Sequence, residues 1–114
     1  MAAPFEELSA LDMVVHEPAR LAILTALSAC RACDFVFLQS LIGLTGGNLS
    51  THLQKLEESA LITVEKRFKG RRPQTMIRLT PKGRTAIERH WRRLEILREA
   101  ARDWRPESGL IDID

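Results

Sequence analysis

One stretch of the chain, GGNLSTHLQKLEE at residues 46–58, combines an apolar face with an uncharged polar face. At about 100° per residue, Leu49, Leu53 and Leu56 fall on one side of a helix. Thr45 precedes the stretch, and a threonine hydroxyl suits the N-cap position. The pattern predicts a helix whose leucines pack on a core, so the rest of the chain must supply that core.

The face opposite the leucines carries amides and hydroxyls where an ordinary solvated helix would more often carry Glu and Lys. Its members are Gly47, Asn48, Ser50, Thr51, Gln54 and Lys55. Asn and Gln can bond adenine bidentately, and Ser or Thr suits several base edges or phosphates. The glycines also leave the N–H groups at the helix N-terminus open to a close phosphate. A polar solvent face with tolerated glycines is the alternative, and the helix alone does not exclude it.

A basic strand–turn–strand pattern follows this helix. Apolar and polar side chains alternate in residues 60–68 and again in 75–80, and the intervening segment 69–74 contains Gly70 and Pro73. The pattern predicts a β-hairpin whose tip carries the cations Lys66, Arg67, Lys69, Arg71 and Arg72. Cations this close repel one another, and a bound polyanion offsets that cost through counterion release. A hairpin that only faces solvent is the alternative, which the preceding polar helix makes weaker.

Three helices are predicted upstream of the polar helix. Apolar residues recur at helical spacing in residues 5–15, 18–29 and 35–42. Asp34 is a candidate N-cap for the third of these, and Gly43 is placed to end it. Only Leu44 and Thr45 then separate it from the polar helix.

The charge of the chain is unevenly distributed. Residues 1–60 carry three basic and seven acidic residues, residues 61–105 carry fourteen and five, and residues 106–114 carry three acidic residues alone. A basic half can mark a polyanion-binding surface. The 114 residues suit one ordinary domain, and no apolar run approaches the ~20 residues of a membrane span. With two cysteines and no secretory pattern, we expect a soluble, cytoplasmic protein without a membrane partner.

The order of these elements resembles that of the winged helix-turn-helix transcription regulators of bacteria and archaea, the MarR- and ArsR-like group. The resemblance covers Asp34 to Ile87. Within it, GNLSTHLQKLEESALI resembles the recognition helix and its exit, KRFKGRRPQT resembles the wing, and LTPKGR resembles the turn into the last helix. Ala60 departs from the pattern, because such regulators usually have Gly there and a left-handed turn costs Ala free energy.

The resemblance implies a mainly α fold with a small β-hairpin (α+β), in which residues 1–114 form a single winged-helix domain. It implies double-stranded DNA as the partner, with residues 45–58 in the major groove and the wing on the backbone or in the minor groove. The DNA-binding residues are then expected to be Thr45, Gly47, Asn48, Ser50, Thr51, Gln54, Lys55, Lys69, Arg71 and Arg72.

The segment 81–105 predicts a long helix with an apolar seam. Two series with seven-residue spacing form it: Ile87, Leu94 and Ala101, and His90, Leu97 and Trp104. This a/d-type spacing is typical of helices that pair, although a helix packed on its own domain is the alternative. The predicted homodimerisation residues are Ile87, Trp91, Leu94, Leu97, Ala101 and Trp104. Residues 5–15 are a second contributor, residues 106–114 form an acidic tail, and a dimer would space two recognition helices by about 34 Å on a pseudo-palindromic site.

Two other functions stay open beside this one. Cys30 and Cys33 have the spacing of zinc ligands, so a metal- or redox-sensing regulator is a variant, although a structural zinc site usually needs four ligands. His52 lies at the apolar edge of its helix, which favours a packed histidine over a ligand. A winged-helix protein-interaction module is the second alternative. Because no catalytic triad, carboxylate pair or phosphate-binding glycine loop is present, we expect neither an enzyme nor a cofactor, and the sequence names no effector.

Overall fold

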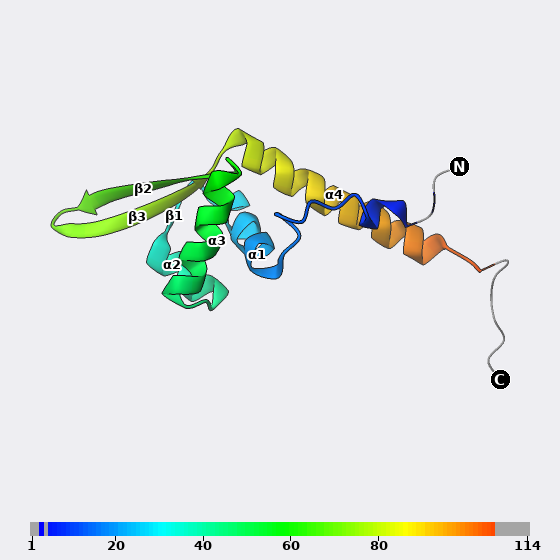
Figure 1. The fold of residues 1–114 in the computed structure, drawn as a ribbon, viewed down its shortest axis with the longest axis horizontal. Coiled ribbons are helices and arrows are strands. Elements are labelled where there is room, and N and C mark those ends of the chain that lie inside the picture. The colour runs from blue at the N-terminus through cyan, green and yellow to red at the C-terminus, as the bar shows by residue number, and fades with distance from the viewer. Residues whose placement is uncertain (1–2, 4, 107–114) are drawn as a thin grey trace.

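A three-stranded sheet and three helices form one end of the molecule, and a long helix extends away from them (Figure 1). The computed structural model describes residue 3 and residues 5–106. Its elements are η1 (Glu6–Leu8), α1 (Pro18–Ser28), β1 (Cys33–Asp34), α2 (Phe35–Ile42), α3 (Gly46–Glu58), β2 (Ile62–Lys69), β3 (Arg72–Leu79) and α4 (Pro81–Asp103). The predicted α+β fold class, mainly α with a β-hairpin and a long last helix, is confirmed.

The core lies between α1, α2, α3 and one face of the sheet, and the start of α4 closes it. Its fully buried members include Ile23, Leu24, Leu27, Leu38, Leu49, Leu56, Ile62, Ile77 and Ile87. The three leucines predicted on the inner face of α3 are all buried. Burying one leucine side chain contributes about 1.5–3 kcal/mol. The leucines therefore fix the rotation of α3, and its polar face must point outward.

Capping residues set the tight connection between α2 and α3. The Asp34 carboxylate accepts a hydrogen bond from the Phe37 N–H, and the Thr45 hydroxyl accepts one from the Asn48 N–H. Gly43 ends α2 at φ 78°, in the left-handed region where a glycine has no Cβ to clash. The predicted caps of both helices are therefore confirmed.

The hairpin is longer than its sequence predicted. The sheet order is β1-β3-β2, and Lys69 pairs with Arg72, so the turn consists of Gly70 and Arg71 instead of the predicted residues 69–74. Pro73 lies inside β3 on a part that β1 does not reach, so its missing N–H removes no bond to β1. Reading the proline as a loop residue was wrong because β3 is an exposed edge at that point.

The N-terminal segment is not the helix that the spacing in residues 5–15 predicted. Only η1 is helical, and the Asp12 carboxylate accepts a hydrogen bond from the Val14 N–H in a local turn that competes with a helix. The segment lies along α4, where the Arg93 guanidinium donates to the Ala10 carbonyl oxygen at 2.9 Å. Its buried apolar side chains are Leu11 and Val15. Because residues 5–15 pack along α4, they form an irregular segment, called the strap below, and not a helix.

The start of α4 packs directly on the backbone between α3 and β2. Ala60 has φ 61°, so it adopts the left-handed turn of the family pattern although this conformation costs Ala free energy. The Thr80 hydroxyl donates to the Ala60 carbonyl oxygen at 2.7 Å, and the Thr80 N–H donates to that of Leu61 at 3.0 Å. A Cβ added to Gly83 would overlap with the Leu61 carbonyl. The glycine of LTPKGR is thus required by close approach of two backbones.

Beyond this junction α4 projects away from the core, and the molecule measures 68 × 31 × 21 Å. No helix in the part of the chain that the structure describes is long and apolar enough to cross a membrane. The acidic residues of the predicted tail, from residue 107 onward, lie outside the described residues.

Candidate nucleic-acid interface

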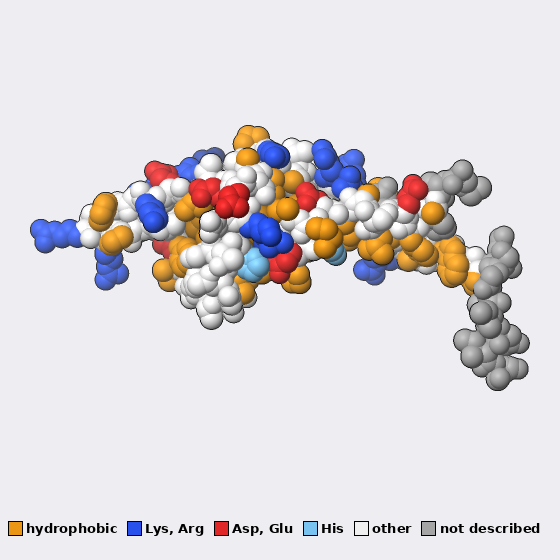
Figure 2. Space-filling model, in the orientation of Figure 1, with side chains coloured by type: hydrophobic (Ala, Val, Ile, Leu, Met, Phe, Trp, Pro, Cys, Tyr) orange, Lys and Arg blue, Asp and Glu red, His pale blue; other side chains and the backbone are white. Residues whose placement is uncertain are grey.

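Every residue predicted to bind DNA is exposed to solvent. On α3, the exposed face begins at the N-cap Thr45 and continues through Gly47, Asn48 and Ser50 towards the C-terminal end. Figure 2 shows that the surface over the N-terminal part of α3 is uncharged, whereas lysine and arginine side chains gather at the tip of the hairpin. The molecule thus presents a neutral polar helix end beside a cationic hairpin.

Two side chains on the outer face of α3 make bonds within the helix. The Thr51 hydroxyl donates to the Gly47 carbonyl oxygen at 3.0 Å, and the Gln54 amide donates to the Glu58 carboxylate at 3.2 Å. Exposed pairs of this kind contribute only about 0.2–0.5 kcal/mol. A base edge can therefore replace the carboxylate as the partner of Gln54 at small cost.

A recess of about 350 Å³ separates α3 from the hairpin. Ser50 and Gln54 line it from α3, and Lys66 and Thr75 line it from the two strands. The recess holds amide, hydroxyl and ammonium groups at one concave surface, which is the chemistry that base edges and phosphates require. The acidic Glu57 also lines this recess, near the C-terminal end of α3.

Phe68 belongs to the same face of the hairpin and was not predicted as a site residue. Side chains two apart on a strand share a face, so Phe68 follows Val64 and Lys66, both of which line the recess beside α3. Its side chain is 73 % exposed. The strand alternation of residues 60–68 was the sequence signal that could have identified Phe68.

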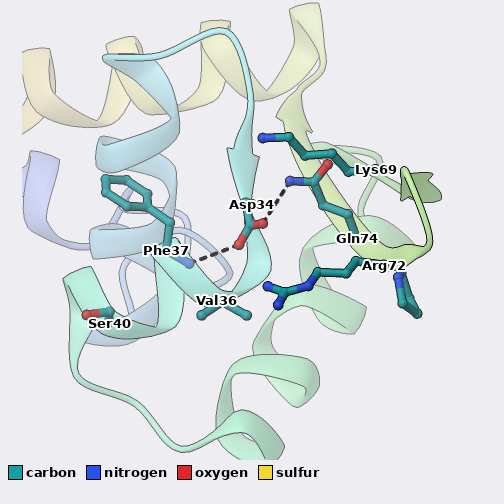
Figure 3. A pocket seen from close by; sticks show the side chains of 8 residues that line it. Asp34, Val36, Phe37, Ser40, Lys69, Arg72 and Gln74 are labelled. Atoms are coloured by element: carbon teal, nitrogen blue, oxygen red, sulfur yellow. Dashed lines mark hydrogen bonds between the residues drawn. The ribbon is translucent and has the colours of Figure 1, made fainter.

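Two other cations of the hairpin, Lys69 and Arg72, lie beside α2 and not beside α3. Lys69 and Arg72 line a second recess, of about 690 Å³, between the hairpin and the start of α2 (Figure 3). There the Gln74 amide donates to the Asp34 carboxylate at 3.0 Å; this bond and the one from the Phe37 N–H lower the pKa of Asp34. Asp34 thereby joins the start of α2 to the hairpin. The predicted residues therefore form two groups, one facing α3 and one facing α2, with Arg71 in the turn between them.

His52 fixes α3 against α1. It is partly buried, its Nδ1 lies 3.3 Å from the Arg20 guanidinium, and the same nitrogen lies 3.6 Å from the Glu17 carboxylate. Arg20 is held in turn by the Val14 carbonyl oxygen at 2.6 Å. The expectation of a packed histidine agrees with this placement, which gives the exposed face of α3 a rigid support.

Residues 19–97 match the family described as "Winged helix DNA-binding domain". The chain belongs to this family. The match includes the outward polar helix, the hairpin and most of α4, so the hairpin is the wing of a winged-helix domain. The predicted winged-helix DNA-binding family is therefore confirmed.

The chain is also similar to individual proteins and solved structures. The uncharacterized protein MJ0432 of Methanocaldococcus jannaschii is 35 % identical over 77 residues, which cover 68 % of this chain and 84 % of that protein. A structure described as a transcriptional regulator homologue from Pyrococcus horikoshii OT3 has a TM-score of 0.80 at 29 % identity and covers 87 % of this chain and 99 % of that one. The repressor CouR, bound to a 23-mer DNA duplex, has a TM-score of 0.70 at 24 % identity over 86 % of this chain and 69 % of that one, a likeness of fold alone.

The cysteine pair follows the end of α1, where Cys30 packs against the hydrophobic core. The Cys30 and Cys33 sulfur atoms are 2.7 Å apart, and Cys33 is in β1. Among the described residues, no group of three or more His, Cys, Asp or Glu side chains is arranged to hold a metal ion. The structure thus offers a thiol pair and, within its described part, no further ligands beside it.

The predicted dimerisation residues divide between the core and the surface of α4. Ile87 is 1 % exposed and packs in the core of its own winged-helix domain, so it is not available to a second chain and its assignment was wrong. Trp91 is exposed at its ring, and its indole N–H donates to the Thr25 hydroxyl at 3.2 Å. Leu94 and Leu97 are partly buried, and Ala101 and Trp104 are exposed. The distal half of α4 retains an apolar surface.

Proposed function

We propose that this protein is a transcription regulator that binds specific double-stranded DNA sequences as a homodimer. The observation that carries the proposal is the concave surface between α3 and the wing, where Ser50, Gln54 and Lys66 converge. The α3 helix enters the major groove, where its amides and hydroxyls meet base edges. The wing lies on the adjacent backbone or minor groove, where its cations meet phosphates.

Each part of the surface has a separate task. The leucines that anchor α3 leave Asn48, Thr51 and Gln54 outward for base discrimination. The N–H groups at the start of α3 suit a phosphate, and the bare Gly47 allows that phosphate to approach. Arg71 and Arg72 at the wing tip add sequence-independent affinity.

The relatives support this assignment. The Pyrococcus horikoshii structure, described as a transcriptional regulator homologue, matches 87 % of this chain and 99 % of its own, and CouR carries the same fold on a DNA duplex. These likenesses favour a regulator over a winged-helix module that binds only another protein.

A salt series with selected duplexes tests the proposal. Sequences are first selected from random duplex DNA, and binding is then measured by fluorescence anisotropy for wild type, Gln54→Ala and an Arg71→Ala/Arg72→Ala double variant. We expect Gln54→Ala to lose roughly 1–3 kcal/mol of discrimination at one base step. We expect the double variant to weaken binding to every sequence and to reduce the slope of log K against log salt by about 2.

Arg98→Ala is the matched control, because Arg98 is an exposed cation on α4, remote from the wing. It is expected to leave the salt slope unchanged. Full binding by the double variant across the salt series would contradict the role of the wing. Absence of any duplex binding by wild type at low salt would instead favour the protein-interaction module.

The homodimer rests on the distal half of α4 and on the strap beside it. Leu97 is partly buried there, and the Trp104 and Phe5 rings contact each other in a tilted arrangement, with centroids 6.0 Å apart. Leu97→Lys is expected to shift the sedimentation coefficient of a dimer to that of a monomer. Glu99→Lys adds a lysine at an exposed neighbouring position and is expected not to. A wild-type monomer at DNA-binding concentrations would remove the dimer from the proposal.

A further inference from the structure

The thiol pair Cys30 and Cys33 sits where two parts of the DNA-binding fold are joined. Cys30 follows the end of α1, and Cys33 opens β1, where it pairs with Ile77 of the wing strand β3. The next residue, Asp34, caps α2 and bonds Gln74. A covalent link between the two sulfur atoms would therefore tie the end of α1 to the strand that positions both α2 and the wing.

We infer that Cys30 and Cys33 form a reversible intramolecular disulfide that staples this joint. The sulfur atoms are 2.7 Å apart, whereas a disulfide bond measures about 2.05 Å. The two sulfur atoms would therefore have to approach each other by about 0.65 Å. Because the fold already holds the two atoms together, the bond preserves the arrangement of α1, α2 and the wing instead of disrupting it.

The two thiols have unequal access, which sets the order of the chemistry. Cys33 is 3 % exposed, whereas Cys30 is only partly buried, with its thiol donating to the Ala26 carbonyl oxygen at 3.1 Å. Burial, together with the contact from Cys30, raises the pKa of Cys33 to about 12. Cys30 is therefore the thiol that meets an external oxidant, and Cys33 is the one that resolves the product.

The oxidant in this scheme is a small disulfide such as oxidised glutathione. The Cys30 thiolate attacks one glutathione sulfur, and a mixed disulfide forms while one glutathione thiolate leaves. Cys33 then gives its proton to solvent and attacks the Cys30 sulfur, which expels the second glutathione thiolate. Two protein thiols lose two electrons, and one glutathione disulfide is reduced to two thiols, so electrons and atoms balance.

A zinc site is the competing use of this sequence pattern. Tetrahedral structural zinc takes four ligands, and the described residues hold no set of three or more candidate groups. A sulfur pair this close also favours bond formation, because two thiolates that share a metal ion are held apart by it. The disulfide is therefore the better supported chemistry.

The wild-type protein provides the main test. It is equilibrated in glutathione buffers of graded ratio, free thiols are alkylated in acid, and mass and non-reducing electrophoresis are recorded. We expect both thiols to disappear together, with a loss of two hydrogen atoms and no covalent dimer. The oxidised form is expected to melt at least about 4 °C higher, because the crosslink restricts the unfolded chain.

Single-cysteine variants check the order of attack. Cys33→Ser is expected to accumulate the mixed glutathione disulfide at Cys30, and Cys30→Ser to react far more slowly because Cys33 is buried. Thiols that stay reduced when oxidised glutathione is in excess, covalent dimers, or a stable glutathione adduct on wild type would each overturn the inference. So would stoichiometric zinc in the purified protein that is lost in Cys33→Ser. Because the main measurement uses wild type, misfolding of a variant does not remove the test.

Discussion

Replacing Gly47 by Ala separates the stability of α3 from its proposed contact with DNA. Gly47 is in the first turn of α3, and a Cβ built there meets nothing within 4 Å. Glycine inside a helix costs roughly 0.5–1 kcal/mol relative to alanine. The substitution should therefore raise the free energy of unfolding, by an amount at the lower end of this range because the first turn is only partly constrained.

The same methyl group would stand where a phosphate must approach the N–H groups of the helix. A hydrogen bond to a charged group contributes about 1.5–3 kcal/mol, so its loss should weaken DNA binding by roughly tenfold or more. One substitution is thus expected to stabilise the protein and to impair its binding. A variant that binds weakly because its fold is damaged would lose stability as well, so the opposite signs distinguish a blocked phosphate from misfolding.

Urea unfolding followed by circular dichroism measures the first effect, and anisotropy with a selected duplex measures the second. Gly46→Ala is the matched control, because its Cβ would meet only the Gln39 side chain at 3.9–4.0 Å. It is expected to leave DNA affinity unchanged. A Gly47→Ala protein that is more stable and binds DNA as tightly as wild type would refute the close approach of phosphate to α3.

Further substitutions probe the packing, the titration and the wing. Gly83→Ala should destabilise the domain by about 3 kcal/mol in urea melts, because its Cβ overlaps with the Leu61 carbonyl; an unchanged midpoint would contradict the packing of α4. Burial, with a smaller contribution from His16 3.1 Å away, lowers the pKa of His90 below its usual 6.5, Arg93 acts in the same direction and Asp12 opposes it. The unfolded chain then binds more protons, so stability should be full above about pH 6.5 and fall as the pH drops below it. His90→Leu should flatten that pH dependence in urea midpoints measured across pH. An equal slope in the variant would mean that a group other than His90 causes the pH dependence. Phe68→Ala should weaken DNA binding by about 1.5 kcal/mol through lost apolar burial while leaving the salt slope unchanged; a changed slope in the anisotropy series would mean that the ring only positions its basic neighbours.

Elements whose signals are local were predictable from the sequence. Asp34, Gly43 and Thr45 act through their own side chains or their own φ, within three residues of the helix ends that they define. The inward face of α3 depended only on the period of its leucines. Because the leucines fix the inner face of α3, the polar residues opposite them could be predicted to form its outer face.

Features that depend on distant neighbours were not predictable. A proline usually indicates a loop, but Pro73 fits in β3 because β1 does not pair with that part of the strand and so needs no N–H from it. Residues 5–15 have helical spacing, yet contact with α4 and the Asp12 turn give an irregular strap. Which basic residues share a face of the wing depends on where β3 begins. The sequence predicted its start at residue 75, three residues after the observed start at Arg72, so the two faces were not distinguished.

The seven-residue apolar spacing in α4 joins two different surfaces. Its first part packs in the core of the domain, and its distal part is exposed. A helix of 23 residues is about 35 Å long, and its buried residues, Gly83, Ile87 and His90, all lie in its first half. The seven-residue series continues past the edge of the core to Trp104, which is 46 % exposed, and Ile96, outside the series, is exposed to the same extent. Among the residues that the structure describes, the strap is the segment that lies along this part of α4. Substituting Ile87 by a polar residue should therefore unfold the protomer, whereas substituting Leu97 should leave a folded monomer. Loss of folding in both variants would mean that the distal half also serves the protomer, and the case for a helix-mediated dimer would lose its structural basis.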